Sequence, residues 1–300
     1  MKYVVTGGAG FIGSNLAAEL AVGQGHEVVI LDDLSTGRME NIDGCADRQN
    51  VTFVRGSVLD EELLQEICAG ADGVFHQAAI ASVPRSVDDP MAAHAANLTG
   101  TLHVLIAARD AGVRRVVAAS TAALYGNNPV MPKRETMAPE TLSPYAAGKL
   151  ACEHYGQAFS ACYGLSTAFL RYFNVFGPRQ DPGSGYAAVI PAFISRLLAG
   201  DPPLIFGDGT QTRDFVFIRD VVRANILAMA GTAEGAFNIA CGKQTSLIEL
   251  AAMLSAITGV DLPPAYAGPR AGDVQYSVAD IGKARVAFGY EPAWTMRDGL

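Results

Sequence analysis

Close to its start the chain reads Thr6-Gly7-Gly8-Ala9-Gly10-Phe11-Ile12-Gly13. A short apolar run precedes these residues and a segment of helical period follows them, so the glycines stand at a strand-to-helix turn. Gly7 permits the tight turn, Gly10 lets the backbone approach a pyrophosphate, and Gly13 lets the helix pack closely on the strand. The helix N-terminus offers free N–H groups to phosphates. The run predicts a dinucleotide site, with cofactor contacts at Gly7, Gly10, Phe11, Ile12 and Gly13.

An acidic residue, Asp32, ends the second apolar run. It follows Gly13 at the spacing of about 20 residues at which a carboxylate accepts hydrogen bonds from the adenosine ribose. A carboxylate there repels a 2′-phosphate, so the sequence favours NAD over NADP. Arg38 lies nearby and weakens this preference slightly.

Short apolar runs alternate with longer segments of helical period through the first half of the chain. Several runs are apolar at nearly every position, which is typical of strands covered by helices on both faces. We therefore expect an α/β fold with a Rossmann-type, doubly wound parallel sheet, and ligands at the carboxyl ends of its strands. The expected strands are Tyr3–Thr6, Val28–Leu31, Thr52–Arg55, Gly73–His76, Arg115–Ala119 and Thr167–Arg171, and the expected helices are Phe11–Val22, Asp60–Cys68, Ala93–Ala111 and Ser143–Tyr163.

The character of the sequence changes after about Asn174. Loop-forming residues become frequent, as in Gly177-Pro178 and Asp201-Pro202-Pro203. We expect residues 1–174 to form the dinucleotide-binding domain and residues 175–300 to form a smaller C-terminal substrate-binding lobe. The two parts are expected to interleave, so this boundary is approximate.

Composition narrows the function. The 300 residues include 22 basic and 30 acidic side chains, for a net charge of −8, which disfavours non-specific nucleic-acid binding. No apolar run reaches the roughly 18 residues of a membrane span. The five cysteines form no C-x-x-C pair, and the five histidines lack metal-ligand spacing. The sequence predicts a reduced, cytoplasmic protein without a metal, a nucleic-acid partner or a membrane partner.

A tyrosine and a lysine lie four residues apart in Tyr145-Ala146-Ala147-Gly148-Lys149. On a helix they share one face, and a lysine ammonium beside a phenol is expected to lower the phenol pKa towards neutrality. Tyr145 is then a candidate general base or acid. Two hydroxyls, Ser120 and Thr121, follow a predicted strand at the ligand-binding edge of the sheet.

Together these motifs resemble the extended short-chain dehydrogenase/reductase family. Further motifs are similar to those of its UDP-sugar epimerases. They are His76-Gln77-Ala78-Ala79, Asn97-Leu98-Thr99-Gly100-Thr101, Arg171-Tyr172-Phe173-Asn174-Val175-Phe176-Gly177-Pro178, Phe206-Gly207-Asp208-Gly209-Thr210-Gln211-Thr212-Arg213-Asp214-Phe215 and Arg270-Ala271-Gly272-Asp273.

The resemblance implies a role for each matching residue. Thr121, Tyr145 and Lys149 match the catalytic residues. Ser57 stands where relatives often carry Asp, which leaves the adenine contact open. The implied cofactor contacts, beyond the glycine turn, are Asp32, Ser57, Val58, Ala78, Asn97, Tyr145, Lys149 and Tyr172. The implied substrate contacts are Ala81, Ser120, Thr121, Asn174, Ala188, Val189, Arg213, Arg270, Asp273 and Ser277.

The activity implied is NAD-dependent inversion of C4 of a UDP-hexose through a 4-keto sugar. Ser277 aligns with a position that is a bulky tyrosine in relatives restricted to UDP-glucose and UDP-galactose, so N-acetylated sugars are expected to be accepted too. A one-residue shift would place Tyr276 there instead. The resemblance also implies a homodimer, formed through helices in Ala93–Ala111 and Ser143–Tyr163.

Three alternatives remain at this point. A 4,6-dehydratase places an acidic residue directly after the strand-end threonine, whereas Ala122-Ala123 follows Thr121. A UDP-glucuronate 4-epimerase or decarboxylase needs a cation for the sugar carboxylate, and Arg85 and Arg179 are available. A non-catalytic NAD-binding protein typically loses the Tyr/Lys pair, which this chain keeps.

Overall fold

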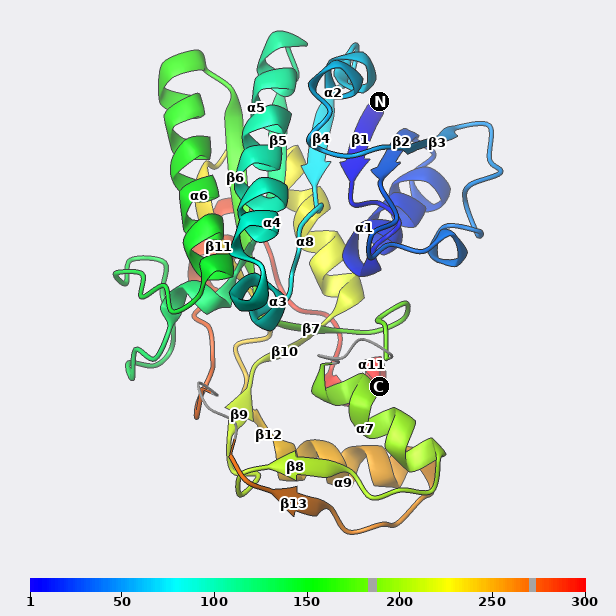
Figure 1. Cartoon of the computed structure of the whole chain (residues 1–300), viewed down its shortest axis with the longest axis vertical. Helices are drawn as coiled ribbons and strands as arrows, with labels where there is room; N and C mark the ends of the chain where they lie inside the picture. The colour runs from blue at the N-terminus through cyan, green and yellow to red at the C-terminus, as the bar shows by residue number, and fades with distance from the viewer. Residues whose placement is uncertain (183–187, 270–273) are drawn as a thin grey trace.

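The computed structural model describes residues 1–182, 188–269 and 274–300. Figure 1 shows a large sheet flanked by helices and, below it, a smaller lobe of short strands and helices. The N-terminus lies in the large part, and the C-terminal helix α11 (Met296–Gly299) packs on strand β10 (Phe215–Phe217). Helix α7 (Val189–Leu198) lies in the smaller lobe.

Seven parallel strands form the large sheet, in the order β11-β6-β5-β4-β1-β2-β3. The direction of strand addition reverses between β1 and β4, which is where open α/β sheets bind ligands. The fold class expected from the sequence is confirmed, and the six predicted strands are present with bounds that agree within two residues. The strands are β1 (Lys2–Thr6), β2 (Glu27–Asp32), β3 (Val51–Arg55), β4 (Gly73–His76), β5 (Arg115–Thr121), β6 (Ser166–Tyr172) and β11 (Gly235–Ile239).

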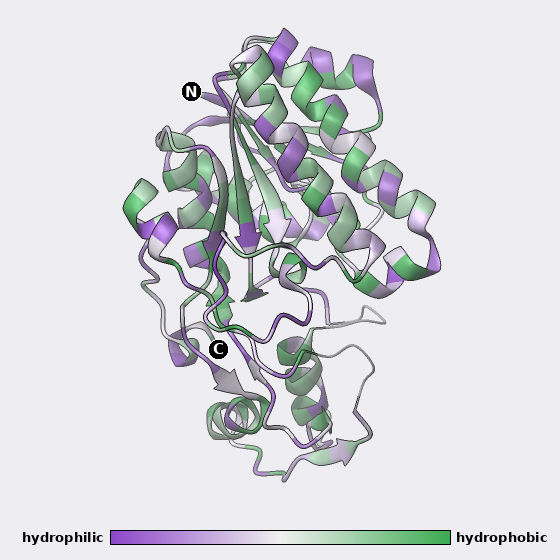
Figure 2. Cartoon of the chain, turned by 90° about the vertical axis from the view of Figure 1, so that its left-hand side faces the viewer, coloured by the Kyte–Doolittle hydropathy of each residue, from purple (hydrophilic) through white to green (hydrophobic). Residues whose placement is uncertain are grey.

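Neighbouring residues of one strand pack on opposite faces of the sheet. Val5 lies in a core cluster with Leu16, whereas Val4 lies in a second cluster with Leu64. Since both faces are covered, apolar residues occupy successive positions and the strands lack an apolar–polar alternation. Figure 2 shows that the helices carry hydrophilic and hydrophobic residues side by side, as expected of helices with one face on the sheet.

The helices of the large part agree less closely with the prediction. Asp60 caps a helix by accepting a hydrogen bond from Leu63 N at 3.0 Å, so this helix begins one residue later than predicted. The predicted helix Ala93–Ala111 is interrupted by a π-helical turn, which adds one residue without changing the apolar pattern visibly. The helices are α1 (Phe11–Ala18), α2 (Glu61–Cys68), α3 (Val83–Asp88), α4 (Pro90–His94), α5 (Gly100–Asp110), α6 (Pro144–Tyr163) and α8 (Ile218–Ala230), with π-helical turns η1 (Glu19–Gly23) and η3 (Ala95–Thr99) and 3₁₀ turns η2 (Met39–Asn41) and η4 (Ala122–Tyr125).

The smaller lobe is built from pairs of short strands. β10 pairs with β7, β12 with β9 and β13 with β8. A capping box of Ser246 and Glu249 begins its helix α9, and Gly259 ends it in the left-handed conformation. The elements are β7 (Asn174–Phe176), β8 (Leu204–Phe206), β9 (Thr212–Arg213), β10 (Phe215–Phe217), β12 (Thr245–Ser246), β13 (Ala265–Ala267), α7, α9 (Leu247–Thr258), α10 (Gly282–Phe288) and α11 (Met296–Gly299).

The chain crosses between the two parts more than once. After the first strands of the smaller lobe, α8 packs on β5 and β6, and β11 then adds a seventh strand beside β6. Buried Asp220 on α8 accepts hydrogen bonds from Ala293 N at 2.8 Å and Trp294 N at 3.1 Å, which fixes the C-terminal segment. We propose that the dinucleotide-binding domain comprises residues 1–174 together with residues 218–239.

Within the described ranges, no helix has both the length and the apolar character that crossing a membrane requires. The His, Cys, Asp and Glu side chains of those same ranges form no group of three or more that could hold a metal ion.

Candidate active site

A cavity of about 1010 Å³ lies at the carboxyl edge of the sheet. The β1–α1 turn, the ends of β2, β3 and β4, and the loop at residues 179–182 all contribute to its lining. Ten residues that the sequence predicts to contact ligands line it: Gly7, Gly10, Phe11, Ile12, Gly13, Asp32, Ser57, Val58, Ala78 and Ala81.

Three of the four glycines of the turn, Gly7, Gly10 and Gly13, have different surroundings. A Cβ on Gly7 would lie 2.6 Å from Ala78 N, and a Cβ on Gly13 would lie 2.2 Å from Gly7 O, so neither position has room for a side chain. A Cβ on Gly10 would meet the protein only at Gly7 O, at 3.2 Å, and Gly10 lines the cavity. No side chain caps the N-terminus of α1. Backbone N–H groups are therefore available to a phosphate, and the turn fits a dinucleotide.

Asp32 is buried at the end of β2. Its carboxylate accepts hydrogen bonds from Ala9 N and Leu34 N, each at 2.9 Å. Burial raises the pKa of Asp32, and these backbone N–H groups oppose the rise. Because each carboxylate oxygen has two lone pairs, Asp32 can also accept from ribose hydroxyls. Arg38, which slightly weakens the preference for NAD that the sequence indicates, forms an exposed ion pair with Asp181 at 3.0 Å.

The predicted cofactor contacts beyond the turn have partners within the protein. Ser57 accepts a hydrogen bond from Leu59 N at 3.2 Å. The amide of Asn97 is buried and bonds both backbone groups of Ile80, at 2.7 Å and 3.1 Å. Asn97 thus holds the loop after β4 that carries Ala81, and it contributes to the cavity through that loop.

The Tyr/Lys pair lies in the first turns of α6. Ser143 caps this helix through Ala146 N at 3.1 Å. The Tyr145 amide, also at the helix start, donates to the buried Ser86 Oγ at 3.1 Å. Ser86 follows Arg85, which lines the cavity, so α3 connects the cavity wall to Tyr145. The sequence does not predict this role of Ser86, because nothing in the local pattern around Ser86 indicates a contact with a residue so far along the chain.

Thr121 at the end of β5 hydrogen-bonds the Tyr145 hydroxyl. Lys149, one helical turn after Tyr145, donates from Nζ to Ala119 O at 3.0 Å. The structure thus brings the three predicted catalytic side chains together at the strand edge. Ser120, predicted to contact substrate, donates its hydroxyl to Glu153 Oε1 at 2.6 Å.

The electrostatics differ from those that the Tyr/Lys spacing predicts. Burial raises the pKa of the Tyr145 phenol, and the hydrogen bond with Thr121 opposes the rise. Burial lowers the pKa of Lys149, against the effects of Cys152 and Glu153. The expected fall of the Tyr145 pKa towards neutrality is therefore wrong for the protein alone, since burial disfavours both charged forms.

Tyr172 at the end of β6 pairs with Thr121 in the sheet and contacts the cavity wall through Gln77. Its hydroxyl donates to Gln77 Oε1 at 3.1 Å and accepts from Asn225 Nδ2 at 2.8 Å. Gln77 itself lines the cavity. Burial raises the pKa of Tyr172, so this phenol remains a neutral hydrogen-bonding group.

The predicted substrate residues of the smaller lobe are more dispersed. Asn174 begins β7 and is exposed, and Ala188 and Val189 stand at the N-terminus of α7. Arg213 on β9 donates from Nη1 to Thr212 O at 2.8 Å and Val274 O at 2.6 Å. Ser277 is half-buried. Arg270 and Asp273 lie outside the described residues.

Asp214 is a buried acid that the sequence analysis quoted within a motif but assigned no role. Its carboxylate accepts hydrogen bonds from Cys241 N at 2.8 Å and from Gly242 N and Ala279 N, each at 3.0 Å. Burial raises its pKa to about 6, against these N–H groups. Asp214 thereby ties β10 to two loops that are distant in the sequence.

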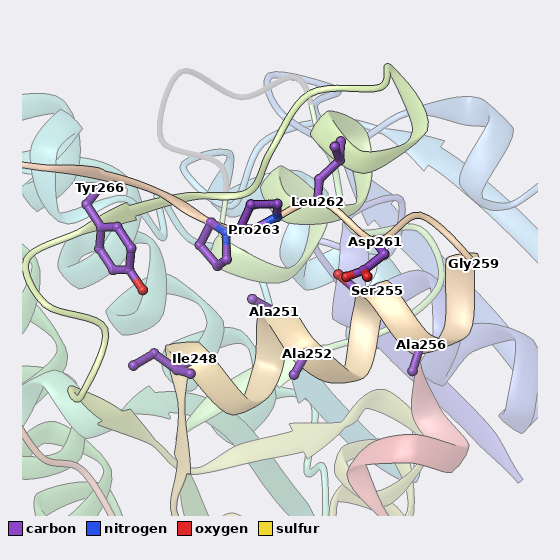
Figure 3. A pocket seen from close by; sticks show the side chains of 11 residues that line it. Ile248, Ala251, Ala252, Ser255, Ala256, Gly259, Asp261, Leu262, Pro263 and Tyr266 are labelled. Carbon is purple, nitrogen blue, oxygen red and sulfur yellow. The ribbon is translucent and has the colours of Figure 1, made fainter.

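A second hollow, of about 490 Å³, lies on α9 of the smaller lobe. Figure 3 shows Ala251 of α9 pointing towards Pro263, and Ile248 at the start of α9 lying below Tyr266. Asp261 is the one acidic residue that lines this hollow, and none of the predicted site residues lines it. Its lining lacks the convergent polar groups of the cavity at the sheet edge.

Comparisons with known proteins agree with this geometry. The model of the NAD dependent epimerase/dehydratase family matches residues 3–240. The UDP-glucose 4-epimerase of Mycolicibacterium smegmatis is 41% identical over 304 residues, covering 100% of this chain and 96% of that protein.

Two solved structures are similar over nearly their whole length. The UDP-N-acetylglucosamine 4-epimerase from Methanobrevibacter ruminantium M1, in complex with UDP-N-acetylmuramic acid, has a TM-score of 0.93 at 40% identity, covering 97% of this chain and 92% of that one. The UDP-glucose 4-epimerase of Thermotoga maritima, with UDP-glucose, has a TM-score of 0.93 at 41% identity, covering 100% of this chain and 96% of that one.

Proposed function

Since this chain belongs to the NAD dependent epimerase/dehydratase family and is a UDP-glucose 4-epimerase-like enzyme, we propose that it inverts C4 of a UDP-hexose through a 4-keto sugar. One observation carries the proposal. The hydroxyls of Thr121 and Tyr145 meet at the strand edge, with Lys149 one turn away. None of the three lines the cavity that fits a dinucleotide, but Tyr145 bonds Ser86, which directly follows Arg85 of the cavity wall. That combination suits oxidation and reduction of a carbinol carbon.

The residues that would hold the cofactor are those of the glycine turn, with Asp32 at the adenosine ribose. NAD bound there would supply a hydride acceptor and a positively charged nicotinamide ring. An acidic ribose partner disfavours a 2′-phosphate, so NAD is proposed rather than NADP.

Tyr145 carries the proton chemistry. As a phenolate it takes the proton of the sugar 4-hydroxyl while Thr121 hydrogen-bonds the same oxygen. After the 4-keto sugar has turned its other face, Tyr145 returns the proton. We propose that the positive charge of Lys149, together with that of the nicotinamide ring when NAD is bound, opposes the rise that burial causes in the Tyr145 pKa, because screening by water is weak among buried groups.

The nucleotide anchors the substrate away from the reacting carbon. We propose that Asn174, Arg213 and Arg270 contact the UDP moiety, and that Ala188, Val189 and Asp273 complete its surroundings. Binding energy from these remote contacts lets the sugar ring rotate without leaving the enzyme.

A UDP-glucuronate 4-epimerase or decarboxylase is the second candidate. Arg85 and Arg179 both line the cavity, and Arg179 Nη1 is buried without a hydrogen-bond partner among the described residues. A sugar carboxylate could satisfy this cation. By contrast, Ala122-Ala123 after Thr121 provides no acid for a 4,6-dehydratase.

The first prediction concerns cofactor consumption. Because an epimerase regenerates NAD in every cycle, purified protein should interconvert UDP-glucose and UDP-galactose with less than stoichiometric loss of NAD. Chromatography of the sugars and absorbance of NADH measure both quantities. Consumption of NAD in proportion to product would identify a dehydrogenase instead, and turnover of UDP-glucuronate alone would favour the second candidate.

The second prediction concerns Tyr145. Tyr145→Phe keeps the ring and removes the transferable proton, so kcat should fall about 100- to 10,000-fold while the fold is retained. Thr121→Val should also slow turnover. Initial rates and circular dichroism test this, with Tyr155→Phe as the control because Tyr155 is an exposed tyrosine of the same helix. Near wild-type turnover in Tyr145→Phe would remove Tyr145 from the mechanism.

The third prediction concerns the sugar at C2. We propose that Ser277 leaves room for an N-acetyl group, with Ala81 as a further small residue in the cavity wall. Ser277→Tyr should then reduce kcat/KM for UDP-N-acetylglucosamine far more than for UDP-glucose, because a bulky ring excludes the larger substituent. Tyr276→Ser is the matched control for a one-residue shift. If Ser277→Tyr leaves the ratio of the two efficiencies unchanged, Ser277 does not wall this pocket.

The fourth prediction is a homodimer. Exposed apolar side chains lie on α4 and α6, where Met91 is 74% exposed and Tyr163 56%. Helices of two subunits that pair through such faces would cover them. Light scattering at micromolar concentration should give twice the chain mass of 31.4 kDa, and a monomer mass would contradict the proposal.

A further inference from the structure

A buried ion pair joins α6, the helix that carries Tyr145 and Lys149, to strand β6. Arg171 on β6 binds Glu153 on α6 in a bidentate manner, with Nη2–Oε2 at 2.7 Å and Nε–Oε1 at 2.9 Å. Their side chains are 5% and 9% exposed. Removing two charges from water is costly, and an apolar pair of similar size is often at least as stable. Stability of the fold alone therefore gives little reason for the pair.

Glu153 connects the catalytic helix to the catalytic strand. Tyr145, Lys149 and Glu153 follow one another at intervals of four residues on α6, so they share one face of the helix. The Glu153 carboxylate also accepts the hydroxyl of Ser120 at 2.6 Å. Since Ser120 directly precedes Thr121, one carboxylate fixes the spacing between the elements that carry Thr121 and Tyr145.

Arg171 extends the connection to the smaller lobe. Its Nη1 donates to Tyr125 Oη at 3.0 Å, and Tyr125 donates to Asn238 Oδ1 at 2.6 Å. Asn238 Nδ2 then donates to Lys133 O at 2.9 Å and Asp280 O at 3.1 Å. The chain of bonds thus runs from the catalytic helix to loops that flank the proposed sugar pocket.

The pair also determines the charge around Lys149. Glu153 favours the Lys149 ammonium against burial, and Cys152 does the same. Arg171 balances the charge of Glu153, so the ammonium remains the net positive charge beside Tyr145. Other titratable side chains around the start of α6 include Arg85 and Asp88 on α3, His94 on α4, His103 on α5, His76 on β4, Tyr125 on η4 and Tyr172 on β6. Lys283 on α10 interacts electrostatically with both Glu153 and Arg171, and Glu135 interacts with Lys283 and Tyr125.

We propose that Glu153 and Arg171 are positioning residues of the epimerase reaction, which hold Tyr145 and Thr121 in register and set the charge that Tyr145 experiences. This inference rests on the proposed function. A purely structural pair would make the same contacts, so the test must separate loss of structure from change of charge.

The two partners differ in the sign of the charge that each mutation removes. Glu153→Gln removes a negative charge, which favours the Tyr145 phenolate and moves the acid limb of the kcat–pH profile to lower pH. Arg171→Gln removes a positive charge and moves that limb to higher pH. Eight helical residues span roughly 12 Å, and an effective dielectric constant of about 20 then gives shifts of roughly one pH unit or less. The double variant should return close to the wild-type profile.

The experiment is the pH dependence of kcat with UDP-glucose for the full chain with NAD added. The exposed pair Arg285 and Glu291 provides matched controls, because Arg285→Gln and Glu291→Gln remove the same charges elsewhere. Shifts of opposite sign in the two buried variants, with none in the controls, are expected. Shifts of the same sign, or no shift, would overturn the proposal.

A second readout does not depend on turnover. Ultraviolet titration of the phenolate, taken as the difference between each variant and its Tyr145→Phe counterpart, reports Tyr145 directly and should show the same opposite shifts. A wild-type protein that lacks turnover would refute the proposed function, while this titration would still test the pair.

Ser120→Ala is a milder variant that leaves both charges in place, should Glu153→Gln or Arg171→Gln fail to fold. Loss of its hydrogen bond to Glu153 should lower kcat about 3- to 10-fold. KM for UDP-glucose should be unchanged, because the role is positioning rather than binding. An unchanged kcat, or a change confined to KM, would contradict the positioning role.

Discussion

The close approach of backbone to backbone at Gly7 and Gly13 is the constraint on which the site depends. A Cβ at either position would lie within 2.6 Å of a backbone atom, so β1, α1 and the loop after β4 can converge only without side chains there. Their convergence leaves the glycine turn at the wall of the crevice between β1 and β4, where we propose that the phosphates of the cofactor bind. Asp32 then follows at the end of the adjacent strand, held by the same turn through Ala9 N.

Local pattern was sufficient to predict six strands of the large sheet. They are short, mostly apolar runs with a length that a helix would exceed, and their observed bounds agree with the predicted ones within two residues. The seventh, Gly235–Ile239, was missed because it contains Gly and Asn, which strands disfavour, and because its partner β6 lies far earlier in the chain. The two- and three-residue strands of the smaller lobe show no periodicity at all.

For the site, too, the sequence predicts contacts within one element and does not predict contacts between distant elements. Tyr145 and Lys149 lie on one helix, so their spacing predicts their proximity. Contacts between elements left no such local sign, as with Ser86, which bonds the Tyr145 amide from α3. Glu153 stood at the next position on the face of Tyr145 and Lys149, and that spacing could have drawn attention to it. Its partner Arg171 belongs to one of the sequence motifs. The motif does not indicate that the Arg171 side chain faces α6, and this is seen only once the register of β6 is known.

The proposed sugar pocket is framed by backbone hydrogen bonds rather than by side-chain packing. The segment that carries Ser277 is held at Gln275 O by Thr212 N and at Val278 O by Lys133 N, at 2.9 Å and 2.8 Å. The Asp214 carboxylate also accepts a hydrogen bond from Ala279 N in the same segment. None of these bonds uses the side chain of residue 277. A pocket built in this way can change the shape of its wall at one position while its frame is maintained, so relatives of one fold can differ in the sugar that they accept.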